Sequence, residues 1–463
     1  MAYLYFTLKK LYLFSVAVLV CILYLAFRTD GDKPVFIPTS PQRPGDAAVG
    51  YTYLTTGDYL KSGIPFQLFS MANKKDTNNY LGRTGLNRDV PYDYTVVKAA
   101  NGEVVVAPNC LQCHGQVFEG KLYVGLGNAA MDFSGSSALA GTSSQLYNLL
   151  KISGGKKFEA ANRFLTATKT ISPYLQTNVR GVNAADRLAA VLAAHRNPAT
   201  FEWSDKSLLT LTDEVVPTDV PAWWMLKKKN AMFYNGFGRG DFSKFLMASN
   251  LLTVTDTAES REVYSHFNDV LAFINSIQPP KYPGPIDEGL ASKGHTIFKQ
   301  TCAGCHGTYG ENGKYPNLLI PASVIGTDSA LYSSNYSSPQ FVDWFNKSWF
   351  TMGDNPAKLV PYQGYIAPPL DGVWITAPYL HNGSVPTLEA ILYSKTRPTF
   401  WSRDFDKPEY DYEKNGWKYT TALTPSKGVY NTTLAGYGNY GHNFGDKLND
   451  NQRKAVIEYL KTL

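Results

Sequence analysis

The sequence contains two copies of one pattern, Cys110-Leu111-Gln112-Cys113-His114 and Cys302-Ala303-Gly304-Cys305-His306. This pattern, C-x-x-C-H, is the signature of c-type haem attachment. One helical turn separates the two thiols, so both can form thioethers with the haem vinyl groups, and the adjacent imidazole then reaches the iron. The sequence therefore predicts two covalently bound haem c groups, with His114 and His306 as proximal iron ligands.

Two other kinds of site use paired cysteines. Four thiolates from two C-x-x-C pairs suit zinc, but a zinc site leaves the histidine after each pair unexplained. A redox C-x-x-C needs no following histidine and would not occur twice. Of the five cysteines in the chain, four belong to the two motifs and the fifth, Cys21, lies near the N-terminus. Haem attachment therefore accounts for these residues best.

Composition narrows the class of protein. Hydrophobic residues make up 44% of the 463 residues, which excludes intrinsic disorder for most of the chain. Five cysteines are too few for the disulfide scaffold of a small secreted protein. The formal net charge of +6 is spread too thinly over this length to indicate a nucleic-acid partner.

The N-terminus has the pattern of a membrane anchor. Lys9 and Lys10 precede an uncharged apolar run over residues 11–27, which is long enough to span a bilayer. The exit of this run, Leu25-Ala26-Phe27-Arg28, lacks a small-x-small cleavage site, so an uncleaved anchor over 1–33 is favoured over a cleaved signal peptide. The two lysines should stay cytoplasmic, which predicts a single-pass protein of the inner membrane with its bulk in the periplasm.

The rest of the chain divides into two similar parts. Prolines at 34, 38, 41 and 44 predict an extended tether over residues 34–44. Apolar residues with the same helical spacing predict closing helices at 270–277 and 456–463, and a proline-rich segment follows the first. We therefore expect a first haem domain over 45–280 and a second over 286–463. The expected fold class is mainly α, with two cytochrome c-like haem domains and long irregular insertions after one transmembrane helix.

These features resemble the bacterial di-haem cytochrome c peroxidase superfamily, and most closely its rubber-oxygenase-like branch. The resemblance rests on the tandem motifs, on residues 109–115, on Pro221-Ala222-Trp223-Trp224, on the run 372–388 with Ala377-Pro378-Tyr379-Leu380-His381-Asn382-Gly383-Ser384-Val385 within it, and on Gly441-His442-Asn443-Phe444-Gly445. The resemblance implies that one haem is six-coordinate and relays electrons, while the other binds peroxide or dioxygen. Some relatives also hold calcium between the haems, which makes calcium a candidate cofactor.

The distal ligand of the second haem follows from the same resemblance. It implies a histidine near the C-terminus, so His306 and His442 are the expected axial pair. Met352 is the alternative, and a methionine in place of a histidine would raise the haem potential. The helix expected over 387–395 contains no methionine of the kind that peroxidases use there.

No residue stands out as the distal ligand of the first haem. His195 ends an alanine-rich helix, where capping explains a histidine. His266 and His295 fall on predicted helices and are interpreted as surface histidines, and Met131 is too close to the attachment site to reach over the ring comfortably. We therefore expect an open or water-occupied first haem.

Trp223, Trp224 and His381 are the candidate catalytic residues. The tryptophans have two interpretations, ordinary core packing or the wall of a pocket and a bridge between the haems, the role that the resemblance implies for aromatic residues. His381 is expected to organise the surroundings of the second haem by hydrogen bonding rather than to bind iron.

Two functions fit these expectations. The first is an oxidoreductase that uses peroxide or dioxygen at the first haem, with the second haem as electron relay. The alternative is a non-catalytic electron-transfer cytochrome with both haems six-coordinate. Either needs an electron-transfer partner, such as a small cytochrome, a copper protein or the quinol pool, and the enzyme also needs a small oxidant or an organic substrate. The missing distal ligand and the size of the domains favour the enzyme.

Overall fold

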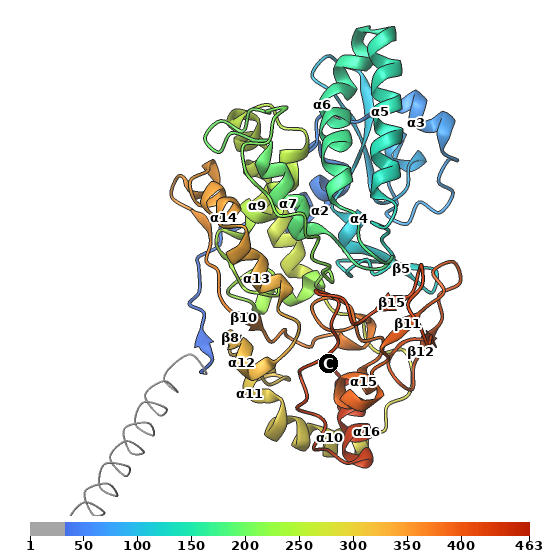
Figure 1. Cartoon of the computed structure of the whole chain (residues 1–463), viewed down its shortest axis with the longest axis vertical. Helices are drawn as coiled ribbons and strands as arrows, with labels where there is room; N and C mark the ends of the chain where they lie inside the picture. The colour runs from blue at the N-terminus through green and yellow to red at the C-terminus, as the bar shows by residue number, and fades with distance from the viewer. Residues whose placement is uncertain (1–32) are drawn as a thin grey trace, which may run out of the picture.

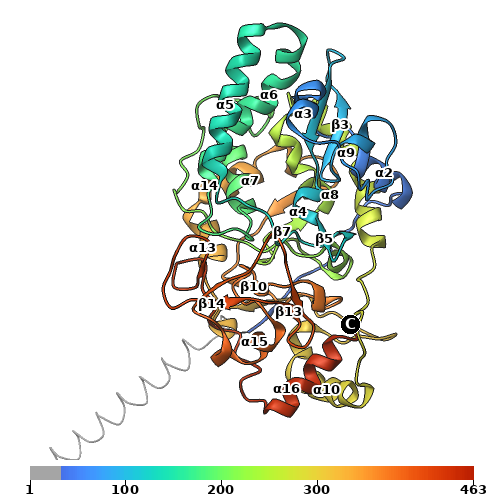
Figure 2. The ribbon, with the colours of Figure 1, turned by 90° about the vertical axis from the view of Figure 1, so that its right-hand side faces the viewer.

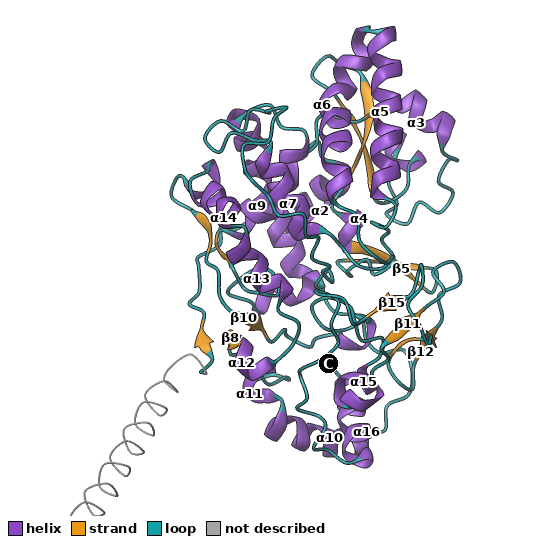
Figure 3. Cartoon of the chain, viewed as in Figure 1, coloured by secondary structure: helices purple, strands orange, loops and turns teal. Residues whose placement is uncertain are grey.

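The computed structural model describes residues 33–463 as a mixed fold, 40% helical and 13% strand (Figure 1, Figure 3). The expected fold class, mainly α, is therefore wrong. The longest strands, β3 (Tyr94–Lys98) and β4 (Val104–Pro108), have five residues each, and most others have two or three. Strands this short leave no clear alternation of apolar and polar residues in the sequence, which is why they escaped prediction.

The α-helices are α2 (Ala47–Thr56), α3 (Phe66–Ala72), α4 (Leu111–His114), α5 (Ser136–Ser153), α6 (Gly155–Ile171), α7 (Ala185–Ala194), α8 (Phe242–Leu246), α9 (Thr257–Ser276), α10 (Glu288–Thr301), α11 (Ala303–His306), α12 (Ala322–Ile325), α13 (Ala330–Ser337), α14 (Pro339–Asn346), α15 (Leu388–Leu392) and α16 (Asp450–Leu460). The remaining strands are β1 (Val35–Phe36), β2 (Ile64–Pro65), β5 (Gly115–Phe118), β6 (Lys121–Val124), β7 (Gly238–Gly240), β8 (Leu318–Pro321), β9 (Ala357–Leu359), β10 (Gly364–Ile366), β11 (Phe400–Ser402), β12 (Tyr410–Asp411), β13 (Gly416–Trp417), β14 (Thr420–Thr421) and β15 (Tyr430–Asn431).

A pair of packed helices closes each half of the chain. α2 packs on α9 and α10 packs on α16, the latter at the end of the molecule opposite the α5–α6 hairpin (Figure 1, Figure 2). Both pairs cross at a glycine: a Cβ on Gly50 would lie 1.9 Å from the carbonyl oxygen of Asp269, and one on Gly294 would lie 1.9 Å from that of Ala455. α9 and α16 lie where the apolar spacing predicts closing helices.

Small antiparallel sheets join segments that are far apart in the chain. In the sheet β1-β8-β10, Leu319 of β8 lies opposite Val35 on one side and Ile366 on the other. Ile37, just after β1, is fully buried. Within the proline-rich segment 34–44, β1 is extended and Ile37 is buried, and its role as a tether stays a prediction.

Two large apolar clusters form most of the core, and both cross between the two halves of the chain. The first core contains Phe267 of α9 together with Trp344 of α14. The second core contains Trp374 together with Trp224 from the first half. β7 and β9 also pair across the two halves. The two expected domains therefore share their cores, while the boundary between them stays a prediction.

The expected membrane span is not found in the described part of the chain. Over residues 33–463, no helix has both the length and the apolar character needed to cross a membrane. This finding contradicts the prediction of a single-pass membrane protein. The inner-membrane localisation depended on that prediction and is withdrawn with it. The apolar run 11–27 and Cys21 lie outside the described residues.

Candidate haem centres

The first C-x-x-C-H motif lies in a short turn between β4 and β5, with its last four residues in α4. Asn109 fixes the entry to this turn: its Nδ2 donates to Tyr92 O and its Oδ1 accepts from Leu111 N, both at 2.9 Å. The Cys110 N–H donates to Tyr59 Oη at 3.2 Å. Both thiols of the motif are free of disulfides and lie on one turn, as the formation of two thioethers requires.

His114 packs against Trp223. The two rings are stacked, with 4.6 Å between centroids and 19° between planes. Trp223 is buried, begins the 3₁₀ helix η3 (Trp223–Lys228) and belongs to the first core. Burial lowers the pKa of His114 to about 3, because the cationic ring is disfavoured away from water. The imidazole is therefore neutral, which is the form that binds a metal.

Polar atoms without partners surround this motif. Among the described residues, the buried Nδ1 of His114 and the buried Oδ1 of Asn183 have no hydrogen-bond partner. Asn183 Nδ2 lies 3.4 Å from Cys113 Sγ and 3.3 Å from Met131 Sδ, so Met131 lies on the attachment side of the motif. Buried polar atoms are normally paired, so the polar contacts of this motif are incomplete in the absence of further groups.

The second motif presents a histidine whose free nitrogen can be assigned. His306 ends α11, and its Nδ1 lies 2.8 Å from Pro368 O. A carbonyl oxygen can only accept, so Nδ1 carries the proton and Nε2 is the nitrogen that is free to bind iron. Tyr309 Oη donates to the backbone oxygen of His306 at 3.0 Å and holds the end of the turn. Burial lowers the pKa of His306, so this ring is neutral too.

The ring of His442 faces that of His306. The ring centroids are 6.1 Å apart and the ring planes are 70° apart. The His442 N–H donates to Ile325 O at 2.8 Å. Burial, followed by the nearby His306 and the charge of Arg397, lowers the pKa of His442 to about 3. The structure therefore brings together, as neutral imidazoles, the two histidines that the sequence pairs.

Met352 lies elsewhere. Met352 is 50% exposed, and its backbone oxygen accepts from Lys244 Nζ at 2.7 Å. It follows the 3₁₀ helix η5 (Trp349–Thr351), whose residues Trp349 and Phe350 belong to the first core. The alternative ligand is thus at the surface beside the first core.

Trp223 and Trp224 point into different cores. Trp223 belongs to the first core, which surrounds the first motif, and Trp224 belongs to the second. Trp224 is 1% exposed, and its Nε1 donates to Asp371 O at 2.8 Å. The pair is therefore core packing and at the same time the junction between the two halves.

Contacts continue from this junction to the second motif. The Asp371 carboxylate pairs with Lys228 Nζ at 2.7 Å. Lys228 Nζ lies 4.7 Å from the ring centroid of Tyr309, and Tyr309 contacts His306 as described above. An unbroken run of contacts therefore leads from His114, through the two tryptophans, to His306.

His381 packs on Tyr365 of β10. The rings are stacked with 4.2 Å between centroids, and His381 Nε2 lies 3.1 Å from Tyr365 Oη. The backbone oxygen of His381 accepts from Asp219 N at 2.7 Å. Burial lowers the pKa of His381 to about 3. Its expected role around the second haem stays a prediction.

The other candidate ligands have ordinary partners. His195 caps α7, and its Nδ1 lies 2.8 Å from Ser204 O. His266 stacks on Tyr53, and His295 contacts Tyr459. Over residues 33–463 there is no group of three or more His, Cys, Asp and Glu side chains that could hold a metal ion, so calcium stays a prediction.

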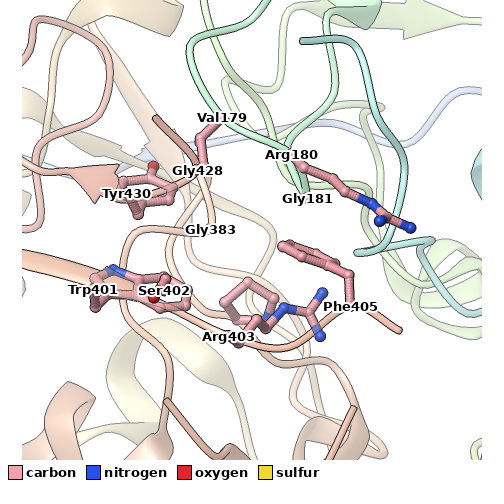
Figure 4. A pocket seen from close by; sticks show the side chains of 11 residues that line it. Val179, Arg180, Gly181, Gly383, Trp401, Ser402, Arg403, Phe405, Gly428 and Tyr430 are labelled. Atoms are coloured by element: carbon pink, nitrogen blue, oxygen red, sulfur yellow. The ribbon is translucent and has the colours of Figure 1, made fainter. Parts of the chain in front are cut away.

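A small hollow, partly open to solvent, is lined by residues from both halves of the chain, among them Arg180, Arg403 and Phe405. Figure 4 shows Phe405 between the side chains of Arg180 and Arg403, whose guanidinium carbons lie 4.7 and 4.4 Å from its ring centroid. Arg180 Nε donates to Ala130 O at 3.0 Å, and Arg403 donates to Ala129 O. The two arginines therefore fix the segment that leads to Met131.

Residues 364–402 match a family described as RoxA-like, cytochrome c-like. Over this segment the chain is similar to a cytochrome c-like domain. Such a domain implies haem c, and the match supports a relationship to the rubber-oxygenase-like di-haem cytochromes.

Two uncharacterised proteins of Sinorhizobium fredii are also similar. Protein y4iM is 27% identical over 293 residues, which is 53% of this chain and 64% of the relative. Protein y4iJ is 31% identical over 255 residues, which is 40% of this chain and 41% of the relative. The chain thus spans less than two thirds of either relative.

The matched segment contains the residues that sequence reasoning missed. It runs from β10 to β11 and includes Pro368, whose oxygen orients His306, and Asp371, the acceptor of Trp224. It also includes Arg397, which contacts the loop of His442. A proline, an aspartate and an arginine outside any motif give no signal in the sequence, because their roles depend on backbone atoms that only the fold brings close.

Proposed function

We propose that this protein is a di-haem c-type cytochrome oxidoreductase of the rubber-oxygenase-like kind, related to the di-haem peroxidases. His306 and His442 would hold the haem of the second motif, which would supply electron relay. His114 would hold the haem of the first motif, which would supply the chemistry with peroxide or dioxygen. The observation that carries the proposal is the difference between the two motifs: His306 faces a second imidazole, whereas His114 packs on an indole.

The separation of His306 and His442 supports a shared iron. A metal–imidazole bond is about 2 Å long and the ring centre lies about 1 Å behind the bonded nitrogen, so two imidazoles on opposite sides of one metal have centroids about 6 Å apart. The distance between the two rings is 6.1 Å. The hydrogen bond from His306 Nδ1 to Pro368 O leaves Nε2 as the ligand atom and raises its basicity.

The packing of His114 supports an open first site. A stacked contact with Trp223 uses the faces of the imidazole and leaves its in-plane nitrogens available. Burial keeps the ring neutral, and the surrounding core excludes water from the attachment side. Haem, when bound, supplies the redox chemistry and the position at which the small oxidant binds.

The contacts between the motifs support transfer of electrons between the two haems. Trp223, Trp224 and Tyr309 provide aromatic rings along the run of contacts from His114 to His306. Electrons would enter from a small cytochrome, a copper protein or the quinol pool. The substrate is a small oxidant, with or without an organic molecule that it oxidises.

Electron paramagnetic resonance of the pure protein tests this proposal. We expect one low-spin haem and one haem with a high-spin signal that responds to cyanide, after full oxidation or after half-reduction. Two low-spin signals that respond to neither cyanide, peroxide nor dioxygen in either state would establish the alternative, a non-catalytic electron carrier with both haems six-coordinate.

A further inference from the structure

The backbone that carries His442 has an unusual conformation. Gly441 and His442 both have positive φ, +75° and +47°. Gly441 lies against the backbone at Gly326, so close that a Cβ on Gly441 would be 2.2 Å from the carbonyl carbon of Gly326. Glycine adopts this conformation readily, but an L side chain such as that of His442 does so rarely. Contacts from outside the loop must therefore hold the histidine in place.

Arg397 provides such contacts. A guanidinium has five N–H donors in a rigid plane, and the three nitrogens of Arg397 donate to five backbone carbonyls. Nε donates to Ala390 O at 3.0 Å, Nη1 to Asn439 O at 2.7 Å and Gly441 O at 2.6 Å, and Nη2 to Ile391 O and His442 O at 3.2 Å. Two of these acceptors belong to α15 and three to the loop, so the side chain fastens the loop to the helix.

A second tie runs parallel to this one. Asp446, which follows the loop, accepts from Ser394 N at 2.8 Å and from Ser394 Oγ at 2.6 Å. The segment 390–397 is thus joined to the segment 439–446 at two places. Of the two ties, only that of Arg397 reaches the backbone oxygen of His442 itself.

We infer that Arg397 is a positioning residue for the distal ligand of the second haem: its five carbonyl contacts hold the left-handed loop so that the His442 imidazole faces His306. The inference rests on the proposed function, because it takes His442 to be an iron ligand. Lysine cannot replace Arg397 fully, since its three donors diverge from one nitrogen and cannot reach carbonyls spread around the edge of a planar group.

The test uses the holoprotein with both haems attached and compares Arg397→Gln, Arg397→Lys and Arg83→Gln. Arg83 is the matched control, because its guanidinium donates to four backbone carbonyls, those of Thr55, Val90, Pro91 and Tyr94, but lies in the first half of the chain. The readouts are the low-spin resonance signal of the second haem, its reduction potential, and the response to added imidazole.

We expect Arg397→Gln to convert roughly half or more of the second haem to a high-spin or water-ligated form that free imidazole returns to low spin. Arg397→Lys should show a smaller loss, and Arg83→Gln should leave the second haem unchanged. An unaltered low-spin signal and potential in both Arg397 variants would overturn the inference. So would loss of both haems to the same extent in the Arg397 and Arg83 variants, since the role would then be general to folding.

The His442→Gly variant separates this inference from the proposed function. If removal of the imidazole leaves the spectrum of the second haem unchanged, the ligand assignment fails and the inference fails with it. If His442→Gly changes the spectrum but the Arg397 variants do not, the ligand assignment stands and only the positioning role is wrong.

Discussion

The imidazole of His114 lies face to face with the indole of Trp223, 4.6 Å away, while the adjacent Trp224 turns into the opposite core. Two consecutive residues thus pack into different cores. The side chain of the first sets the surroundings of one candidate haem ligand, and the Nε1 of the second donates to the segment that leads away from Pro368. Substitutions at the two positions should therefore have separable effects.

Replacement of Trp223 should disturb the first haem. Trp223→Ala removes a buried ring and should lower the free energy of unfolding by about 3–5 kcal/mol, whereas Trp223→Phe keeps the stacking and should cost less. Both should alter the absorbance of the first haem, because the His114 ring loses the face that orients it. Denaturant unfolding and optical spectra of the holoprotein measure these effects.

Trp224→Phe is the matched control for this experiment. It removes the hydrogen bond to Asp371 O and should destabilise the protein without altering the absorbance of the first haem. The opposite pattern, with a change for Trp224→Phe and none for Trp223→Ala, would contradict the account of the junction.

The crossing of α10 and α16 should not tolerate a methyl group at Gly294. A Cβ there would lie 1.9 Å from Ala455 O, so Gly294→Ala must push the helices apart and should cost about 1–3 kcal/mol or more. Gly289→Ala in the same helix would meet only Asp287 Oδ1, at 3.3 Å. It should be neutral or slightly stabilising, because alanine favours a helix over glycine by about 1 kcal/mol. Equal thermal midpoints for the two variants would show that the crossing is not close-packed.

Asp219 should make the stability fall as the pH rises. Burial raises the pKa of Asp219 to about 7, although a hydrogen bond from Tyr234 Oη at 2.6 Å opposes the shift. The folded protein therefore holds this proton more tightly than the unfolded chain, whose aspartate pKa is about 3.9. The contribution is fully present below about pH 4 and is lost as the pH rises to about 7, with a slope of up to about 1.4 kcal/mol per pH unit.

Chemical unfolding at several pH values checks this slope. Relative to the unaltered protein, Asp219→Asn should gain stability as the pH rises from about 5 to about 7. Tyr234→Phe removes the hydrogen bond that favours the carboxylate, so its loss of stability should extend to higher pH. If the unfolding free energies of Asp219→Asn and of the unaltered protein run parallel over this range, Asp219 is ionised in the fold.

Features with local signals could be predicted from the sequence. The attachment motifs need only five adjacent residues, and the helices near 270–277 and 456–463 repeat an apolar spacing that packing on α2 and α10 requires. The pairing of His306 with His442 came from a resemblance, and the two rings are close in the structure. That these histidines bind iron stays a prediction.

Features that depend on distant partners could not be predicted. β8 pairs with β1 at Val35 and with β10 at Ile366. Strands of two to four residues are too short for a sequence periodicity that would predict this pairing. The role of Pro368 depends on its carbonyl oxygen, which every residue has. Nothing in the sequence distinguishes Arg397 from the other arginines, because its five backbone acceptors come from two segments that only the fold brings together.

His306 and His442 are proposed to share one iron. Electron paramagnetic resonance of the oxidised His442→Gly holoprotein tests this most directly, with Met352→Leu as the control. In the unaltered protein the second haem should give a strongly anisotropic low-spin signal, because ring planes 70° apart leave two iron orbitals nearly equal in energy. His442→Gly should abolish that signal, and Met352→Leu should preserve it. A signal that survives His442→Gly, or that disappears in Met352→Leu, would contradict the account.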